Sequence, residues 1–337
     1  MFSLLRSLVE RGIRVTVFTS TRVPQTKKFS EDVGIDVQRV TTASLTQALA
    51  GFCAANKVDL IVTQHLWSDL AILFAKKTGI PSIIFARSHY GNLDLSKGGE
   101  YGCNHIIANS VGVADFVSAR WGRKASIVRS IVRLSDYLTE PGSQEFITIV
   151  NPIELKGGAI FRSIVEQLPD RKFLAVEGWA NFRGPSGWDV DLFKEVCATF
   201  RDELWLPEEI DFSGLKNLTY KSATQDMKEV YAATRLLLVP SLCPESGPRV
   251  AIEAMVNGIP VIGSEVPGIT ETLSTSGVLI RDYRDPNAWV SAVRGMDNIN
   301  CYRRVAESSK SYVASLDYSA EVKRCISIFE QVIQGGL

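Results

Sequence analysis

The sequence predicts an α/β protein made of two Rossmann-like domains, each built on a parallel sheet. Short runs of apolar and β-branched residues alternate with longer segments of helical periodicity along nearly all of the 337 residues. Two such series are separated by a polar, turn-rich stretch, DYLTEPGSQE, at residues 136–145. Alternating strands and helices favour parallel sheets with right-handed crossovers, so we expect two domains with a cleft between them.

The first series opens with an amphipathic helix and then alternates strands with helices. Gly12 and Gly79 each follow a helical segment and are expected to end it, because glycine readily adopts left-handed backbone angles. Segments rich in Val, Ile and Thr are assigned as strands. The expected helices are 2–11, 45–55, 70–77 and 111–119, and the expected strands are 13–19, 37–40, 58–62, 80–86, 106–108 and 126–132.

The second series follows the same alternation, and the two domains are expected at 1–140 and 144–316. The segment 319–333 has apolar residues at helical spacing, so one face of this helix should pack on a domain. Its apolar positions are Val322, Ile326, Phe329, Val332 and Ile333. The expected strands are 146–150, 173–176, 236–239 and 259–263, and the expected helices are 158–167, 192–201, 224–233, 286–294, 298–315 and 319–333.

Composition excludes several classes of protein. The 37 basic and 37 acidic residues balance, so no overall field favours nucleic acid or an anionic membrane. The six cysteines form no Cys-x-x-Cys pair, and scattered thiols are typical of a reducing compartment. No apolar run is long enough to span a membrane, and the N-terminus lacks a signal-peptide pattern. We expect a cytoplasmic protein with no transmembrane segment, no nucleic-acid partner and no metal site.

The most informative stretch is residues 240–271, PSLCPESGPRVAIEAMVNGIPVIGSEVPGITE, which carries Glu245 and Glu253 with seven residues between them. Pro244 and Pro248 bracket Glu245, so its carboxylate is expected in a loop, free to meet a ligand, with Glu253 in the second turn of the following helix. Such loops hold phosphorylated ligands in α/β proteins, and a carboxylate can accept hydrogen bonds from vicinal sugar hydroxyls. A nucleotide-sugar site is therefore predicted. The alternative is a pair of surface glutamates.

A second candidate is Lys156 in NPIELKGG, which follows a strand and opens a helix. A lysine beside Gly157 and Gly158 at a helix start suits a diphosphate, through its charge, the helix dipole and the backbone N–H groups. The alternative is a solvent-exposed lysine in a turn. The segment lacks the glycine spacing and the Ser/Thr of a Walker loop.

His89 is the third candidate, because it follows the strand 80–86 and so faces the expected cleft. The alternative is a histidine that only supports other site residues through a hydrogen bond. His65 has a similar setting, whereas His105 precedes a strand and is expected to be structural. Cys243 is expected to pack rather than act as a nucleophile, since no histidine neighbours it in the sequence.

Together these segments resemble the family 4 retaining glycosyltransferases, also called glycosyl transferases group 1, which have the GT-B fold. The stretch 240–271 resembles the signature of the family, and NPIELKGG resembles its phosphate-binding turn. The segments DMKEVYAATRLLLVPS, HIIANSVGVADFV and VERGIRVTVFT also resemble the family, so the likeness covers nearly the whole chain. The fold implies two Rossmann-like domains facing across a cleft, with the C-terminal helix, 318–335, returning to the first domain.

The resemblance implies a role for each matching residue. Glu245 would contact donor-sugar hydroxyls and support the transition state, and Glu253 would bind the nucleotide ribose. Lys156 would neutralise the diphosphate, and His89 would lie by the donor sugar on the acceptor side. The Gly247–Pro248 turn would lie against the sugar and the diphosphate, and the loop around Ser222 and Ala223 would border the base. The implied catalytic residues are Glu245 and His89, and the implied substrate-binding residues are Asn151, Lys156, Gly157, Ser222, Ala223, Ser246, Gly247, Pro248, Arg249 and Glu253.

The chain departs from the family pattern in three places. Asn151 stands where the family usually has an arginine, and Arg249 could supply the missing phosphate charge. Pro248 stands where a residue with an N–H is usual, and proline cannot donate. The family's first strand and glycine-rich loop do not precede the helix that starts at Phe2, so we expect a truncated sequence or a misassigned start, with an open strand edge in the first sheet.

The resemblance implies transfer of a sugar from a UDP- or GDP-sugar to an acceptor hydroxyl, with retention of configuration and with neither metal nor cofactor. The acceptor class stays open among saccharides, lipid-linked compounds and small molecules, and a lipid acceptor would bring peripheral membrane contact. Three alternatives remain, because a fold does not fix a function. They are another nucleotide-sugar enzyme such as an epimerase, a non-catalytic sugar- or nucleotide-binding homologue, and an interaction scaffold that uses the cleft.

Overall fold

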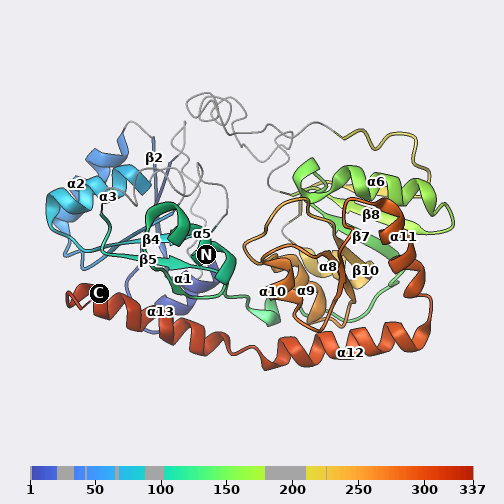
Figure 1. Cartoon of the computed structure of the whole chain (residues 1–337). Coiled ribbons are helices and arrows are strands. Elements are labelled where there is room, and N and C mark those ends of the chain that lie inside the picture. The colour runs from blue at the N-terminus through green and yellow to red at the C-terminus, as the bar shows by residue number, and fades with distance from the viewer. Residues whose placement is uncertain are drawn as a thin grey trace. The chain divides into compact units, whose positions relative to one another are not determined.

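A computed structural model of the chain describes residues 2–20, 34–41, 44–64, 68–87, 102–178, 210–224 and 226–336. These residues form two compact units (Figure 1). The first unit comprises the described residues up to Ile131 together with those from Tyr318 onward, and the second comprises those from Val132 to Asp317. Each unit is a Rossmann-like arrangement of parallel strands and helices, as the alternation predicted.

The first unit contains a four-stranded parallel sheet in the order β3-β4-β5-β6 and a separate parallel pair, β1-β2. Its strands are β1 (Thr16–Ser20), β2 (Asp36–Val40), β3 (Ile61–Thr63), β4 (Ser82–Ala86), β5 (His105–Ala108) and β6 (Ser126–Ile127). Its helices are α1 (Phe2–Val9), α2 (Leu45–Ala55), α3 (Ser68–Thr78), α5 (Val111–Trp121) and α13 (Tyr318–Ile333).

Helices cover both faces of the four-stranded sheet. Ile83 and Phe85 of β4 belong to a buried cluster with α1 and α13, whereas Ile84 and Ala86 pack in another cluster with α3 and α5. This division follows from the strand geometry, in which successive side chains point to opposite faces. The last helix in the sequence therefore packs in the first unit. Its buried face carries Val322, Cys325, Ile328 and Val332, while Ile333, predicted to be part of it, is 43% exposed.

Among the described strands, β1 pairs only with β2, and β3 pairs only with β4. The predicted strand 58–62 is shorter and later than expected, at Ile61–Thr63, and Val62 is 41% exposed. The exposure follows from the edge position, because an edge strand lacks a neighbour on one side.

The second unit is a six-stranded parallel sheet in the order β12-β11-β10-β7-β8-β9. Its strands are β7 (Phe146–Val150), β8 (Lys172–Val176), β9 (Leu218–Lys221), β10 (Thr234–Val239), β11 (Val261–Ser264) and β12 (Val278–Ile280). Its helices are α6 (Gly158–Gln167), α8 (Met227–Ala233), α9 (Arg249–Met255), α10 (Ile269–Leu273), α11 (Pro286–Gly295) and α12 (Ile299–Ser315), with 3-10 turns η5 (Leu134–Asp136) and η6 (Glu154–Lys156).

The order of these strands defines a topological switch point. From β7 the chain continues to β8 and β9 on one side of the sheet, and it then returns to place β10, β11 and β12 on the other side. Open α/β sheets bind ligands at the carboxyl ends of the strands where this direction reverses. A ligand site is therefore expected at the loops that follow β7 and β10.

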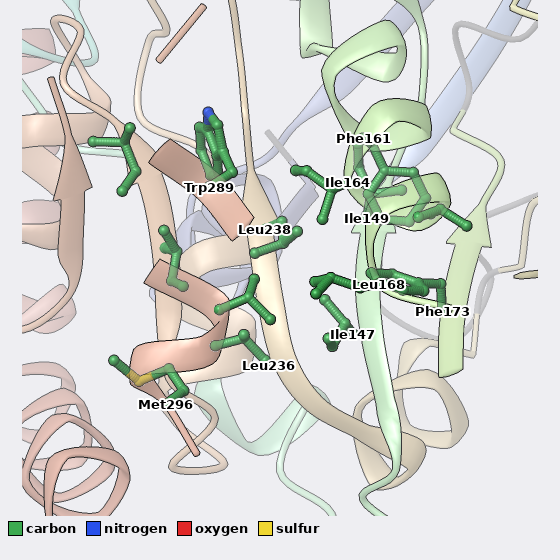
Figure 2. Packing of buried hydrophobic residues seen from close by; sticks show 14 of the residues in the cluster. Ile147, Ile149, Phe161, Ile164, Leu168, Phe173, Leu236, Leu238, Trp289 and Met296 are labelled. Atoms are coloured by element: carbon green, nitrogen blue, oxygen red, sulfur yellow. The ribbon is translucent and has the colours of Figure 1, made fainter. Parts of the chain in front are cut away.

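One face of the second sheet packs against α6 and α11, as Figure 2 shows. Ile147 and Ile149 of β7 meet Phe161 of α6, and Phe161 packs edge-on against Phe173 of β8 with ring centres 5.7 Å apart. Trp289 of α11 is fully buried in the same core and donates from Nε1 to Tyr283 O at 3.0 Å. This core makes the sheet a rigid base for the loops at its carboxyl edge.

Some elements differ from the prediction. β9, β12 and α10 were not predicted, and the helix expected at 192–201 lies outside the described residues. The strand expected at 126–132 is only Ser126–Ile127. Its last backbone bond to β5 is from Val128 N to Ala108 O at 2.9 Å, and the next N–H, that of Arg129, donates to Glu321 Oε2 at 3.1 Å.

The unit boundary also lies earlier than the range 1–140 expected for the first domain. Residues 132–140 group with the second unit because their backbone is bound to it. Asn257 accepts a hydrogen bond from Thr139 N at 2.9 Å and donates to Tyr137 O at 3.1 Å. No described helix combines the length and the apolar content that a membrane crossing demands.

Candidate functional site

The loops that follow β7 and β10 touch at the switch point of the second sheet. Leu242 N donates to Leu155 O at 2.9 Å, which joins the two loops through their backbones. Gly157 has a φ of +76°, and a Cβ at this position would lie 1.9 Å from Pro240 O. Only glycine fits such a close approach, so the turn that carries Lys156 sits directly against the end of β10.

Lys156 and Glu245 form an ion pair across this contact, through Nζ and Oε1. Ser241 donates its hydroxyl to the same oxygen of Glu245 at 2.5 Å. Glu245 is only 9% exposed, so the expectation of a free carboxylate is wrong. The reason is that a buried carboxylate needs partners, and a lysine and a serine supply them. Ser241 was missed, although its position directly after the strand end was a usable signal.

The loop after β11 contacts the backbone of Glu245. Glu245 N donates to Pro267 O at 2.9 Å. Gly268 has a φ of +80°, and a Cβ there would lie 1.8 Å from Glu245 O. Loops from three neighbouring strands, β7, β10 and β11, therefore fix the position of this carboxylate at the carboxyl edge of the sheet.

Glu253 lies in the second turn of α9, as predicted, and is 4% exposed. Tyr231 donates its hydroxyl to Oε2 at 2.8 Å, and Arg249 donates to Oε1 at 3.1 Å. Arg249 also donates to the hydroxyl oxygen of Tyr137 at 2.5 Å. These contacts direct the positive charge of Arg249 to Glu253. In the described arrangement Arg249 therefore does not replace the arginine that the family usually has at the position of Asn151. Tyr137 and Tyr231 were not predicted, because they lie far from Glu253 in the sequence.

Asn151 directly follows β7 and has a φ of +63°, which asparagine tolerates better than most residues. Its N–H donates to Val176 O at 2.8 Å. Its Oδ1 is buried and has no hydrogen-bond partner among the described residues. A Cβ on Gly178 would lie 2.4 Å from the Asn151 side chain, so the tight contact with β8 requires glycine there.

The other predicted binding residues also lie in loops at the carboxyl ends of the strands, but after different strands. Gly247 has a φ of +96°, and Pro248 is the N-cap of α9. Ser222 and Ala223 follow β9, at the edge of the sheet, and are exposed. Ser246 lies between Glu245 and the Gly247 turn and is half-buried.

His89 and His65 lie outside the described residues. His105 bonds through Nε2 to Ser126 Oγ at 2.9 Å, and burial followed by the charge of Arg123 lowers the pKa of its imidazole, which fits a structural role. Cys243 lies against the same turn as Lys156, with Sγ 3.6 Å from Leu155 O. In the part of the chain that the structure describes, no group of three His, Cys, Asp or Glu could hold a metal ion.

Two family models match the sequence. The model described as glycosyl transferase 4-like domain matches residues 1–139, and the one described as glycosyl transferases group 1 matches residues 198–296. Among curated proteins, D-inositol 3-phosphate glycosyltransferase of Corynebacterium kroppenstedtii is 29% identical over 116 residues, which cover 33% of this chain and 25% of that protein. The same-named protein of Corynebacterium urealyticum is 25% identical over 130 residues, 38% of this chain and 30% of that protein. The matches thus span less than a third of those relatives.

Solved structures of low sequence identity share the fold. A glycosyltransferase from Rickettsia africae superposes with a TM-score of 0.74 at 15% identity, covering 98% of this chain and 93% of that one. Sucrose-phosphate synthase from Thermosynechococcus elongatus gives 0.73 at 17% identity, covering 98% and 92%. Anabaena HepE in complex with UDP and glucose gives 0.72 at 15% identity, covering 98% and 94%. The two family models, which together match most of the chain, show that it belongs to the family 4 glycosyltransferases, the glycosyl transferases group 1, and the solved structures show that it has the GT-B fold.

Proposed function

We propose that the protein transfers a sugar from a nucleotide-diphosphate donor to an acceptor hydroxyl, with retention of configuration and without a metal. The observation that carries this proposal is the Lys156–Glu245 pair at the carboxyl ends of β7 and β10. A cation and a carboxylate meet there at the switch point, where α/β sheets bind nucleotides. Membership of the glycosyltransferase family supports sugar transfer as the reaction.

In this proposal Lys156 stabilises the departing diphosphate. Negative charge grows on the leaving group as the glycosidic bond breaks, and a cation already held in place stabilises that charge with little reorganisation. Gly157 and the backbone N–H groups at the start of α6 would face the same phosphates. Ser246 and Gly247 would line the sugar and diphosphate side, where Pro248 contributes shape but no donor, and Arg249 would act on the donor through Glu253.

Glu245 would contact the donor-sugar hydroxyls and support the oxocarbenium-like transition state. Its fixed position suits this role, because a carboxylate that does not need to reorient acts at once on developing positive charge. Glu253 would accept hydrogen bonds from the nucleotide ribose, and Ser222 and Ala223 would border the base. His89 would act on the acceptor side, and Asn151 would present its amide to the phosphates.

The names of related proteins guide the choice of substrates to test. HepE was solved in complex with UDP and UDP-glucose, so UDP-sugars are the first donors to test, with GDP-sugars beside them. The curated relatives are named for D-inositol 3-phosphate, so polyol phosphates are the first acceptors. A cytoplasmic location would supply such donors, and it stays a prediction from the scattered thiols.

A specific observation favours a second candidate, a nucleotide-binding homologue without turnover. Asn151 replaces the family arginine, and Glu245 is 9% exposed, with Lys156 and Ser241 on one of its oxygens. A site of this kind could bind a donor while lacking the second phosphate charge that turnover requires.

A thermal-shift screen with UDP, GDP and their sugars, followed by product analysis with polyol phosphates, separates the two candidates. A bound donor raises the melting temperature by mass action.

Glu245→Ala should lower turnover about 100-fold or more while changing donor Kd far less, because its role lies in the transition state. Glu166→Ala, which removes an exposed ion pair with Arg162, is the control and should change neither. A melting shift without product would favour the binding protein, and no shift with any nucleotide would contradict both.

A further inference from the structure

Glu253 lies in a cluster with Tyr137, Tyr231 and Arg249, which we call the carboxylate cluster. Tyr231 donates to Oε2 of Glu253 at 2.8 Å, and Arg249 Nη2 donates to Oε1 at 3.1 Å. The same Nη2 lies 2.5 Å from the Tyr137 hydroxyl oxygen, and the guanidinium carbon lies 6.0 Å from the centre of the Tyr137 ring. Each oxygen of Glu253 is thus held by a different side chain.

The cluster is buried, and its phenols keep their protons. Glu253 and Tyr231 are 4% and 1% exposed. Burial, followed by the Glu253 carboxylate, raises the pKa of the Tyr231 hydroxyl well above its ordinary value, and the same two causes raise the pKa of Tyr137. Both hydroxyls therefore stay protonated at neutral pH. A buried carboxylate without such neighbours would be costly, so the cluster fixes where Glu253 points.

Tyr137 is also anchored through the backbone on both sides. Asn257 Nδ2 donates to Tyr137 O at 3.1 Å and to Glu253 O at 2.9 Å. Thr139 N donates to Asn257 Oδ1 at 2.9 Å. The segment around Tyr137 is therefore bound to the end of α9, the helix that carries Glu253, and the Tyr137 ring has a fixed place beside Arg249.

The carboxylate keeps hydrogen-bonding capacity for a ribose. A carboxylate has about four acceptor positions, two on each oxygen. Tyr231 uses one position on Oε2 and Arg249 uses one on Oε1. The Tyr137 hydroxyl also hydrogen-bonds this carboxylate, so at least one position remains by the same count to accept from the vicinal hydroxyls of a ribose.

We propose that Tyr137 is a positioning residue for the nucleotide ribose. Through Arg249, and together with Tyr231, it holds Glu253 so that the remaining acceptor capacity is left for the 2′ and 3′ hydroxyls. This inference rests on the proposed role of Glu253 in donor binding. It adds two tyrosines that touch no substrate to the determinants of nucleotide recognition.

The test compares Kd for UDP with Kd for 2′,3′-dideoxy-UDP by isothermal titration calorimetry, and repeats the comparison with the GDP pair. The wild type should prefer the ribose form. Tyr137→Phe keeps the ring but removes the hydroxyl, and the preference should fall by about 10-fold to 100-fold, the contribution of one hydrogen bond to a charged group. Tyr231→Phe should act in the same direction. Tyr302→Phe, which loses a hydrogen bond to Arg235 O at 2.9 Å, is the matched control and should keep the preference.

The ratio of the two Kd values distinguishes positioning from general stability, since a merely structural defect weakens both nucleotides equally. If Tyr137→Phe is folded and keeps the wild-type ratio, while Glu253→Gln loses it, this inference is wrong and the proposed role of Glu253 stands. If Glu253→Gln also keeps the ratio, or the wild type binds neither nucleotide, the proposed role of Glu253 fails and the inference fails with it.

Discussion

At the scale of single residues, the two glutamates of one short stretch are held in different ways. Glu245 receives Lys156 and Ser241 on one oxygen, whereas Glu253 has Arg249 and Tyr231 on separate oxygens. The first arrangement concentrates partners on one side of the carboxylate, and the second divides them between both sides. This difference is consistent with the proposed roles, in which Glu245 contacts the reacting sugar and Glu253 the ribose diol.

Ser241 is the residue whose removal tests the first arrangement. Ser241→Ala should lower turnover about 10-fold to 100-fold with little change in donor Kd, because one hydrogen bond to a charged group is worth about 1.5–3 kcal/mol. Steady-state kinetics and donor titration measure the two effects. Ser309→Ala, which removes an equally buried hydroxyl that donates to Ser276 O at 2.8 Å, should keep turnover. Equal losses in the two variants would mean that Ser241 contributes only to stability.

Sequence reasoning singled out the two glutamates and Lys156 but did not predict which groups would pair with them. The spacing of Glu245 and Glu253 between prolines and a helix is a local pattern, and local patterns can be read directly. The partners depend on chain positions that folding brings together, since Lys156 and Glu245 are 89 positions apart and Tyr231 and Glu253 are 22 apart. Burial of Glu245 was missed for the same reason.

At the scale of elements, the turn before α6 is shaped by the end of β10. Gly157→Ala should lower the free energy of unfolding by about 2 kcal/mol or more, since it combines left-handed strain with a Cβ placed 1.9 Å from Pro240 O. It should also remove the nucleotide-induced melting shift, because Lys156 would move with the turn. Urea denaturation and the thermal-shift assay measure these effects.

Gly214→Ala supplies the matched control for this prediction. Gly214 has a φ of +79°, but a Cβ there would meet nothing within 4 Å. It should therefore lose only the conformational part, about 1 kcal/mol, and keep the nucleotide response. Comparable losses in both variants would contradict the claim that contact with β10 fixes the turn.

The elements themselves were predictable where the pattern is strong. β7, α2 and α6 have the predicted bounds, because dense apolar runs or helical periodicity end at clear turn signals. β9 reads LTYK and has two exposed central residues, so it gives no buried-strand pattern. β12 has three residues, too few to show a period. Edge and short strands depend on pairing with neighbours, which a single sequence does not display.

At the scale of the whole molecule, each unit has its own buried core. Ile83 and Phe85 belong to the core of the first unit, and Phe161 and Trp289 belong to that of the second. The proposed donor residues Lys156, Glu245 and Glu253 all lie in the second unit. Nucleotide binding should therefore act first on the stability of the second unit.

Calorimetric melting of core variants tests this division of roles. Phe161→Leu should lower the transition of the second unit, and Ile83→Val that of the first, each through loss of buried apolar volume. UDP at about 100 times its Kd should stabilise the second unit by about 2.7 kcal/mol, because a ligand stabilises the unit that binds it. The transition that UDP raises should therefore be the one that Phe161→Leu lowers. Should UDP instead raise only the transition that Ile83→Val lowers, the donor residues proposed in the second unit would not form the nucleotide site.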